Sequence, residues 1–174
     1  MTDNDDIRRL GDFASLPDAA IDADKEFLAE LAPWVSNGRI SVEKGSESYF
    51  SLIESKYPIG VNRIDWSRIR NSLFHEVVPF DLPSYSLEYR LDKLTHLRPV
   101  LLDWFLKNAI RLDKDVIVVG DNSNVALHMS LNTVLDCYKV LFTSSQHMYV
   151  LPPTGDWCLH YTLEDTLNFG WAPT

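Results

Sequence analysis

Residues 113–170 read DKDVIVVGDNSNVALHMSLNTVLDCYKVLFTSSQHMYVLPPTGDWCLHYTLEDTLNFG, and they give the clearest indication of the fold. Its apolar runs and turn residues predict a strand at 116–119, a second strand at 125–129 and a helix at 131–142. A β-hairpin over 146–162 follows, and then a short helix. The strand 116–119 is apolar on both faces, which is typical of a central strand. The stretch therefore predicts a compact α+β core over residues 110–170, without a catalytic signature.

Two ends in this stretch carry capping signals. Ser130 is a suitable N-cap for the helix at 131–142. Thr162 followed by Asp165 resembles a capping box, and Gly170 suits a helix C-terminus, so a short terminal helix is expected between them. One alternative stays open, because a helix could also begin directly after the 121–124 turn in place of the second strand.

The first part of the chain supplies helices. Apolar residues at helical spacing predict helices over 22–32, 46–57 and 99–112, the first two ending at prolines. Asp65 can cap a further short helix through Asn71. We expect an α+β fold in which N-terminal helices and a long central helix pack on a small, mostly antiparallel sheet, with a C-terminal β-hairpin and a short terminal helix.

A length of 174 residues fits a single domain over 1–174. Residues 1–20 are polar and acidic and are expected to form a flexible arm. Pro79 and Pro83 break the following chain into extended or looped pieces. No apolar run approaches the roughly 20 residues of a membrane helix, and the start lacks a secretory signal, so a cytoplasmic protein is expected.

The net charge of −9 is unevenly distributed. Residues 1–30 carry −6 and residues 113–174 carry −5, whereas residues 31–112 carry +2. An acidic surface repels phosphate backbones, so direct nucleic-acid binding is not expected, and it attracts basic partners. The alternative interpretation is that acidity only favours solubility.

The two cysteines, Cys137 and Cys158, lie in apolar patterns. Neither belongs to a CxxC pair or to a Cys–His cluster at zinc spacing, so buried free thiols are expected and no metal or cofactor is predicted.

The hairpin register decides which of its histidines meet. A four-residue loop over 152–155 places His147 opposite His160, and a loop that includes Asp156 places His147 opposite Tyr161. In the longer-loop register, one face of the hairpin carries a set of mainly aromatic residues: His147, Tyr149, Leu151, Trp157, Leu159 and Tyr161. That face either serves as a protein interface or is covered by a helix.

Histidines and Asp121 also suggest a second class of function. Asp121 follows a buried strand, and with His128, His147 and His160 it could form the pocket of a small metal-assisted hydrolase. The chain contains no GxGxxG, GxxxxGK[ST], GxSxG or HExxH motif, so this alternative depends on tertiary proximity alone. A turn residue at 121 and unrelated strand histidines are the simpler interpretation.

A resemblance adds to this reading. The run Val116-Ile117-Val118-Val119-Gly120-Asp121, the amphipathic helix 131–142 and the hairpin strands 148–151 and 156–161 with a trailing Glu164-Asp165 resemble small bacterial immunity proteins. These proteins neutralise toxin domains of contact-dependent inhibition and other polymorphic toxin systems. The similarity covers about residues 110–170. The family shares no catalytic residues, so the resemblance implies a binding role and no enzyme activity.

The leading hypothesis is therefore a cytoplasmic immunity protein that binds a cognate basic toxin domain, with a nuclease as the expected target. It is expected to be a monomer or weak dimer that binds neither nucleic acid nor membrane directly. A non-catalytic adaptor is a further alternative. The expected partner-binding residues are exposed acids and one aromatic anchor: Asp121, Asp136, Asp156, Glu164, Asp165, Glu26, Glu30 and Trp157.

Overall fold

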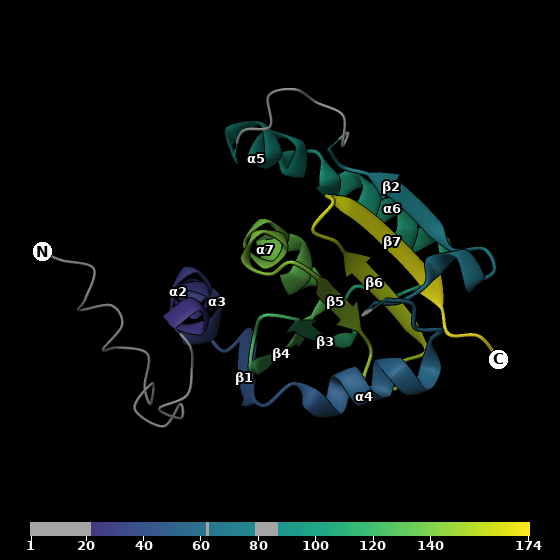
Figure 1. The fold of residues 1–174 in the computed structure, drawn as a ribbon. Helices are drawn as coiled ribbons and strands as arrows, with labels where there is room; N and C mark the ends of the chain where they lie inside the picture. The colour runs from purple at the N-terminus through teal and green to yellow at the C-terminus, as the bar shows by residue number, and fades with distance from the viewer. Residues whose placement is uncertain (1–21, 62, 79–86) are drawn as a thin grey trace, which may run out of the picture.

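A computed structural model describes residues 22–61, 63–78 and 87–174 (Figure 1). The proposed acidic arm and the two prolines at 79 and 83 lie outside these residues. In chain order the elements are α2 (Asp22–Glu30), α3 (Ala32–Ser36), β1 (Ile40–Lys44), α4 (Glu47–Lys56), the 3₁₀ turn η2 (Trp66–Arg68), β2 (Leu73–Glu76), α5 (Leu87–Thr95), α6 (Leu97–Lys107), β3 (Asp115–Gly120), β4 (Val125–Ser130), α7 (Leu131–Ser144), β5 (Met148–Leu151), β6 (Trp157–Tyr161) and β7 (Thr166–Trp171).

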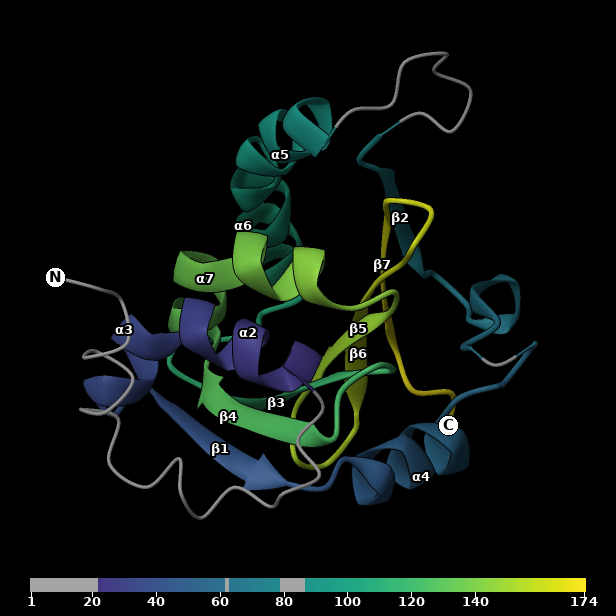
Figure 2. The ribbon, with the colours of Figure 1, turned by 60° about the vertical axis from the view of Figure 1, so that its left-hand side comes forward.

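The strands form one seven-stranded sheet in the order β1-β4-β3-β5-β6-β7-β2. Every neighbouring pair is antiparallel. Helices pack on both faces of the sheet, with α2 and α7 on one side and α4 on the other (Figures 1 and 2). The fold is thus α+β, as predicted, although the sheet is larger than the small one expected.

Two hydrophobic clusters lie on opposite faces of this sheet. On the α7 face, defined by the helices α2, α6 and α7, the core includes Val116 and Val118 of β3. On the α4 face, defined by α4 and residues 57–61 and 63–69, the core includes Ile117 and Val119. Strand β3 is therefore buried on both sides, which confirms the prediction of a central strand.

The helix predicted over 131–142 is confirmed as α7, and its N-cap is Ser130, whose side chain accepts a hydrogen bond from the backbone N–H of Thr133. The predicted second strand is confirmed as β4, so the helix does not begin directly after the turn. The helix predicted over 46–57 is α4. At 22–32 the chain forms α2 and then α3, because Pro33 lies in the first turn of α3 and starts a new helix.

The helix predicted over 99–112 is shorter, since α6 ends at Lys107. The N–H of Ala109 donates to the carbonyl of Leu106 and the N–H of Ile110 donates to that of Phe105. With Ala109 at a φ of 56°, this is a Schellman motif that terminates the helix. Likewise, Asp65 accepts a hydrogen bond from the backbone N–H of Ser67, but it caps only the single turn η2, not a helix through Asn71.

The short terminal helix was predicted wrongly, because residues 166–171 form strand β7. The Thr162 hydroxyl oxygen accepts from the N–H of Thr166, and the Asp165 N–H donates to the Thr162 carbonyl, so the capping residues close a strand-to-strand turn. Gly170 is not a helix cap. A Cβ at Gly170 would lie 3.1 Å from side-chain atoms of Ile69 and Trp66, so the glycine lets these side chains pack closely against the strand.

Neither predicted register of the hairpin is correct. Tyr149 lies opposite His160, and Val150 lies opposite Leu159. This register places Leu151 opposite Cys158. The connection between the two strands is therefore longer than either expected loop. Trp157, Leu159 and Tyr161 therefore share the α7 face with Met148 and Val150. Because helices cover both faces of the hairpin, the aromatic side chains are core residues and do not form an open interface.

Candidate functional site: a cleft beside a histidine pair

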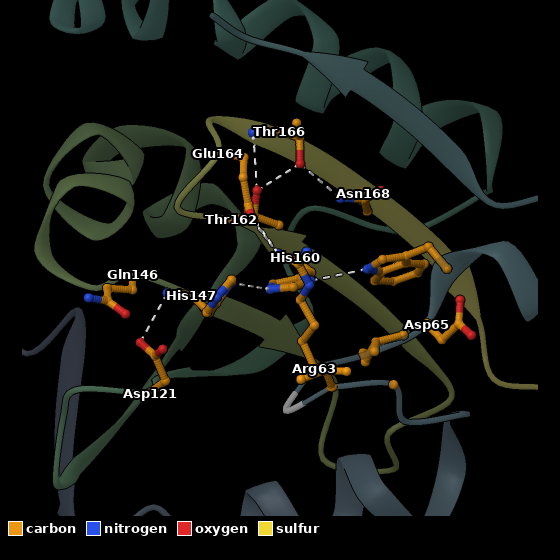
Figure 3. Close-up of a pocket in the computed structure, with 14 residues that line it drawn as sticks. Arg63, Asp65, Asp121, Gln146, His147, His160, Thr162, Glu164, Thr166 and Asn168 are labelled. Atoms are coloured by element: carbon orange, nitrogen blue, oxygen red, sulfur yellow. Dashed lines mark hydrogen bonds and ion pairs between the residues drawn. The ribbon is translucent and has the colours of Figure 1, made fainter. Parts of the chain in front are cut away.

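A cavity of about 920 Å³ opens on the α4 face of the sheet (Figure 3). Residues 60, 61 and 63–66 form one wall, and the β6–β7 turn with strand β7 forms another. Asp121, from the β3–β4 turn, and His147, directly before β5, close a third side. The antiparallel pairing of β3, β5, β6 and β7 brings these segments together, although they are up to about a hundred residues apart in sequence.

Three hydrogen-bonded side chains link one wall of this cavity to another. The indole Nε1–H of Trp66 donates to Nδ1 of His160 at 3.1 Å, and Nε2 of His160 lies 3.2 Å from Nδ1 of His147 (Figure 3). His160 is fully buried, and its ring stacks on that of Tyr149 at a centroid separation of 4.2 Å. We call these three residues, Trp66, His160 and His147, the Trp–His–His chain.

The direction of each bond in the Trp–His–His chain follows from its first member. An indole can only donate, so Nδ1 of His160 has no proton. A neutral His160 then carries its proton on Nε2 and donates it to Nδ1 of His147. Consequently His147 must also be the Nε2–H tautomer, and in this arrangement neither ring turns a lone pair toward the cavity.

Burial opposes a charge on His160. Desolvation, together with the neighbouring His147 and the Arg63 guanidinium, holds the pKa of His160 well below its ordinary value. The ring is thus neutral at physiological pH. Within the described part of the chain, no group of three His, Cys, Asp or Glu side chains is placed to hold a metal ion.

Asp121 is held at the mouth of the cavity by the backbone of His147. Its Oδ1 accepts from the His147 N–H at 3.0 Å, and its own N–H donates to the His147 carbonyl at 3.1 Å. These paired bonds fix the start of β5 against the end of β3. The Asp121 carboxylate is in an exposed residue, and among residues 22–61, 63–78 and 87–174 it makes no ion pair.

Arg63 and Glu164 form an ion pair across the cavity entrance. One guanidinium nitrogen of Arg63 donates to both carboxylate oxygens, at 2.7 and 2.8 Å. Partial burial opposes ionisation of Glu164, but the hydrogen bond from Arg63 and one from the backbone outweigh it and keep the Glu164 pKa below its usual range. The pair joins the 60–66 segment to the β6–β7 turn.

The structure brings together three of the four residues of the hydrolase alternative, namely Asp121, His147 and His160. His128 lies elsewhere on the α4 face, where its Nε2 is 2.6 Å from a Glu43 oxygen and 3.3 Å from the Tyr49 hydroxyl. The Tyr49 hydroxyl also donates to Glu43, and this bond raises the pKa of Tyr49 to about 12. His128 therefore belongs to a separate cluster.

Several of the predicted partner-binding acids are paired within the protein. Asp136 pairs with Arg39 at 2.5 Å, Asp156 approaches Lys56 at 3.5 Å, and Glu164 binds Arg63. Such exposed pairs contribute little to stability, but they reduce the charge offered to a partner.

Two other predicted contact residues are buried. Asp165 is 2% exposed and binds Arg90 at 2.7 Å, and it also accepts a hydrogen bond from the Tyr161 hydroxyl. Trp157 is 5% exposed and packs between Phe105 and Phe169. Both side chains belong to the folded interior, and neither reaches a partner surface in this conformation.

Glu26 and Glu30 lie exposed on α2, and neither forms an ion pair among the described residues. Asp24 of the same helix is buried, accepts from the Ser123 hydroxyl at 2.8 Å and so fastens α2 to the β3–β4 turn that carries Asp121. We call Glu26, Glu30 and Asp121 the acidic edge.

Sequence reasoning did not anticipate the contribution of Trp66 and Arg63 to this cavity. Both lie in a stretch that shows no clear periodicity, and its one local feature is the placement of Arg63, Arg68 and Arg70 on either side of Trp66. The cysteines behave as predicted, since both are buried and free, and burial raises the pKa of Cys137 to about 12.

No family model matches the chain, and no curated protein matches it in sequence. None of the helices in the described part of the chain combines the length and the apolar character that crossing a membrane requires.

Proposed function

We propose that the protein is an immunity-type binding protein of the cytoplasm that captures and neutralises a basic partner, with a toxin nuclease domain as the expected class. The observation that carries this proposal is the acidic edge. Its three carboxylates lie on segments joined by the Asp24–Ser123 bond, and they make no ion pair among the described residues, whereas Asp136, Asp156, Glu164 and Asp165 are already paired.

The physical basis is electrostatic complementarity. A nuclease has a positive active site because it holds phosphates, and unpaired carboxylates attract such a surface from a distance. The net charge of −9 acts in the same direction. The resemblance of residues 110–170 to immunity proteins supports the same class of function, and a non-catalytic role is proposed with it.

The runner-up, a metal-assisted hydrolase, is less well supported. It requires an imidazole lone pair directed at an ion, and the Trp–His–His chain commits both Nδ1 atoms to hydrogen bonds within the protein. Metal analysis of the purified protein tests this alternative directly. A stoichiometric zinc or manganese content would favour the hydrolase over the binding protein.

The proposed function predicts that the purified protein, used as bait in an extract of its native host, retains one basic protein as its main partner. Purified together, the two should bind tightly, and association should slow as salt increases because the steering is electrostatic. Replacing the acidic edge (Glu26→Gln, Glu30→Gln, Asp121→Asn) should lower the association rate constant about tenfold. Surface plasmon resonance at two salt concentrations measures this.

A matched control changes the net charge by the same amount, but at positions outside the acidic edge. The variant Glu88→Gln, Asp92→Asn, Asp115→Asn removes three exposed acids from α5 and the start of β3, and none of the three makes an ion pair among the described residues. It should associate much faster than the acidic-edge variant. Equal rates for the two variants would show that only net charge matters, and the absence of any basic partner would contradict the proposal.

A further inference from the structure

The Trp–His–His chain ends in a hydrogen-bond donor that has no partner among the described residues. Nδ1 of His147 is occupied by His160, so the proton of a neutral His147 is on Nε2. His147 lines the cavity, and its Nε2 makes no hydrogen bond within the described ranges. The cavity thus offers a positioned N–H group to an acceptor oxygen of a ligand.

The charges around this donor select the kind of ligand. Four charged residues line the cavity, Arg63, Asp65, Asp121 and Glu164, for a net charge of −2 while both histidines are neutral. Arg63 is engaged by Glu164, and Asp65 accepts from the N–H and hydroxyl of Ser67. A phosphate or carboxylate would be repelled, whereas a neutral carbonyl beside a cationic group is complementary.

Exposed apolar side chains lie in the lining of this cavity or next to its lining residues. Val61 lines the cavity and is 90% exposed, and Leu163, next to Glu164, is 54% exposed. Phe74 of β2 lies opposite Asn168, another lining residue, and is 64% exposed. Exposed apolar residues around a polar pocket are typical of a protein-binding site, because their burial excludes water from the central contacts.

We infer that this cleft receives a loop of the basic partner, in which a main-chain carbonyl accepts from Nε2–H of His147 and an arginine or lysine side chain lies against Asp121. The inference rests on the proposed function and deepens it, because it assigns the central contact to this cleft and gives Asp121 of the acidic edge a cationic group to bind. Its two elements, the donor and the carboxylate, can be tested separately and without the partner.

The Nε2–H donor of His147 is tested by determining the tautomers of the His147 and His160 rings. Long-range ¹H–¹⁵N correlation spectra at pH 7.5 should show both His147 and His160 as Nε2–H tautomers. Trp66→Phe removes the indole donor and should release the tautomer of His160, whereas Trp171→Phe, at an exposed site, should not. A wild-type His147 in the Nδ1–H form would overturn the inference.

The carboxylate is tested with two small probes, N-acetyl-arginine amide and its neutral isostere N-acetyl-citrulline amide. The readout is the indole N–H signal of Trp66. The arginine probe should bind in the millimolar range and about fivefold more tightly than the citrulline probe. Asp121→Asn should abolish that difference, and Asp92→Asn should preserve it. Equal binding of the probes to wild-type protein, or signals that change elsewhere, would overturn the assignment.

His147 variants complete the set. His147→Phe removes the donor and should weaken both probes to the same degree, about threefold or more, since a lost hydrogen bond is worth that much. His147→Gln keeps an amide donor and should restore part of the affinity, which separates the loss of the donor from a general loss of structure. A His147→Phe protein that binds both probes as tightly as the wild type would contradict the role of the donor.

Failure of this inference and failure of the proposed function give different results. If a basic partner is captured but binds Asp121→Asn and His147→Phe as tightly as the wild type, the cleft is not the docking site and the proposed function stands. If the arginine probe binds the cleft but the host extract yields no basic partner, the site stands and the proposed function fails.

Discussion

At the scale of single residues, His160 shows how environment decides chemistry. In the sequence it is one histidine among five, alternating with apolar neighbours. In the structure it is enclosed by Tyr149 and Trp66, with both ring nitrogens bonded to protein groups. A residue that ordinarily titrates near neutrality is thereby kept neutral, which stabilises a fixed donor in the cleft.

This burial predicts a pH dependence of stability. The unfolded His160 has a pKa near 6.5, and the folded pKa is well below it, so below about pH 6.5 the unfolded state binds more protons. The stabilisation is complete above pH 6.5 and is lost progressively as the pH falls toward the folded pKa, by up to about 1.4 kcal/mol per pH unit. Urea unfolding at pH 7.5, 6.5 and 5.5 measures it.

In His160→Gln this slope should largely disappear between pH 6.5 and 5.5, although the variant should be less stable at pH 7.5. His96→Gln, at an exposed position, should retain the wild-type slope. Equal slopes for the wild type and His160→Gln would show that another group is responsible.

Gly120 gives a second residue-scale prediction. A Cβ placed there would lie 2.9 Å from the Cβ of Ser145, so Gly120→Ala forces the end of α7 away from β3. The free energy of unfolding should fall by about 1–3 kcal/mol, as overpacking does elsewhere. Ser145→Gly should remove most of that loss in the double variant, and chemical denaturation of all four proteins closes the cycle. Additive losses would contradict the proposed clash.

At the scale of elements, the end of α6 is a case where local sequence misleads. Ala109 continues the apolar helical pattern, yet it adopts a φ of 56° because the chain must turn toward β3. The free-energy cost of the left-handed conformation at Ala109 is offset by the burial of Ile110 in the core. Tertiary packing has overridden helix propensity here.

A glycine substitution at the end of α6 and one within α2 should therefore change stability in opposite directions. Ala109→Gly should stabilise the protein by about 1 kcal/mol, since glycine adopts positive φ without strain. Ala29→Gly, at an exposed position inside α2, should destabilise it by about 1 kcal/mol. Urea unfolding of both variants tests this, and destabilisation by Ala109→Gly would contradict the Schellman ending.

At the scale of the whole molecule, Arg90 connects parts that the sheet does not join. From α5 it donates to Asp165 in the β6–β7 turn at 2.7 Å and to the Phe142 carbonyl of α7 at 3.2 Å. Burial, and then the nearby Asp165 carboxylate, raise the pKa of Tyr161, so its hydroxyl stays protonated and donates to Asp165. The network fixes α5 and α7 against the hairpin.

Breaking this network should be costly. Arg90→Met leaves the Asp165 carboxylate buried without its cation and should destabilise the protein by about 3–5 kcal/mol. Adding Asp165→Asn should recover part of the loss, because asparagine is neutral and tolerates the positive φ at this position. Arg68→Met, at an exposed site, should change stability by less than about 0.5 kcal/mol. Thermal and urea unfolding provide the comparison.

Sequence reasoning succeeded where one local pattern was sufficient. The alternation of apolar and polar residues, the Ser130 cap and the doubly apolar run 116–119 are properties of adjacent residues, and they correctly predicted β3, β4 and α7. It failed at 162–171, where a cap-like turn concealed the alternation of Leu167 and Phe169 with polar and small residues. It also failed at the hairpin, where a difference of one residue moves every side chain to the other face.

The α+β class, most helices and the acidity of the chain follow from local sequence, because propensity and periodicity are properties of neighbouring residues and charge is a property of composition. The pairing of the carboxylates, the meeting of His147 with His160, and the hydrogen bond that His160 receives from Trp66, 94 positions earlier in the chain, are visible in the folded protein alone. Those outcomes depend on strand register and on burial. Both arise from contacts between distant segments, and no local pattern encodes them.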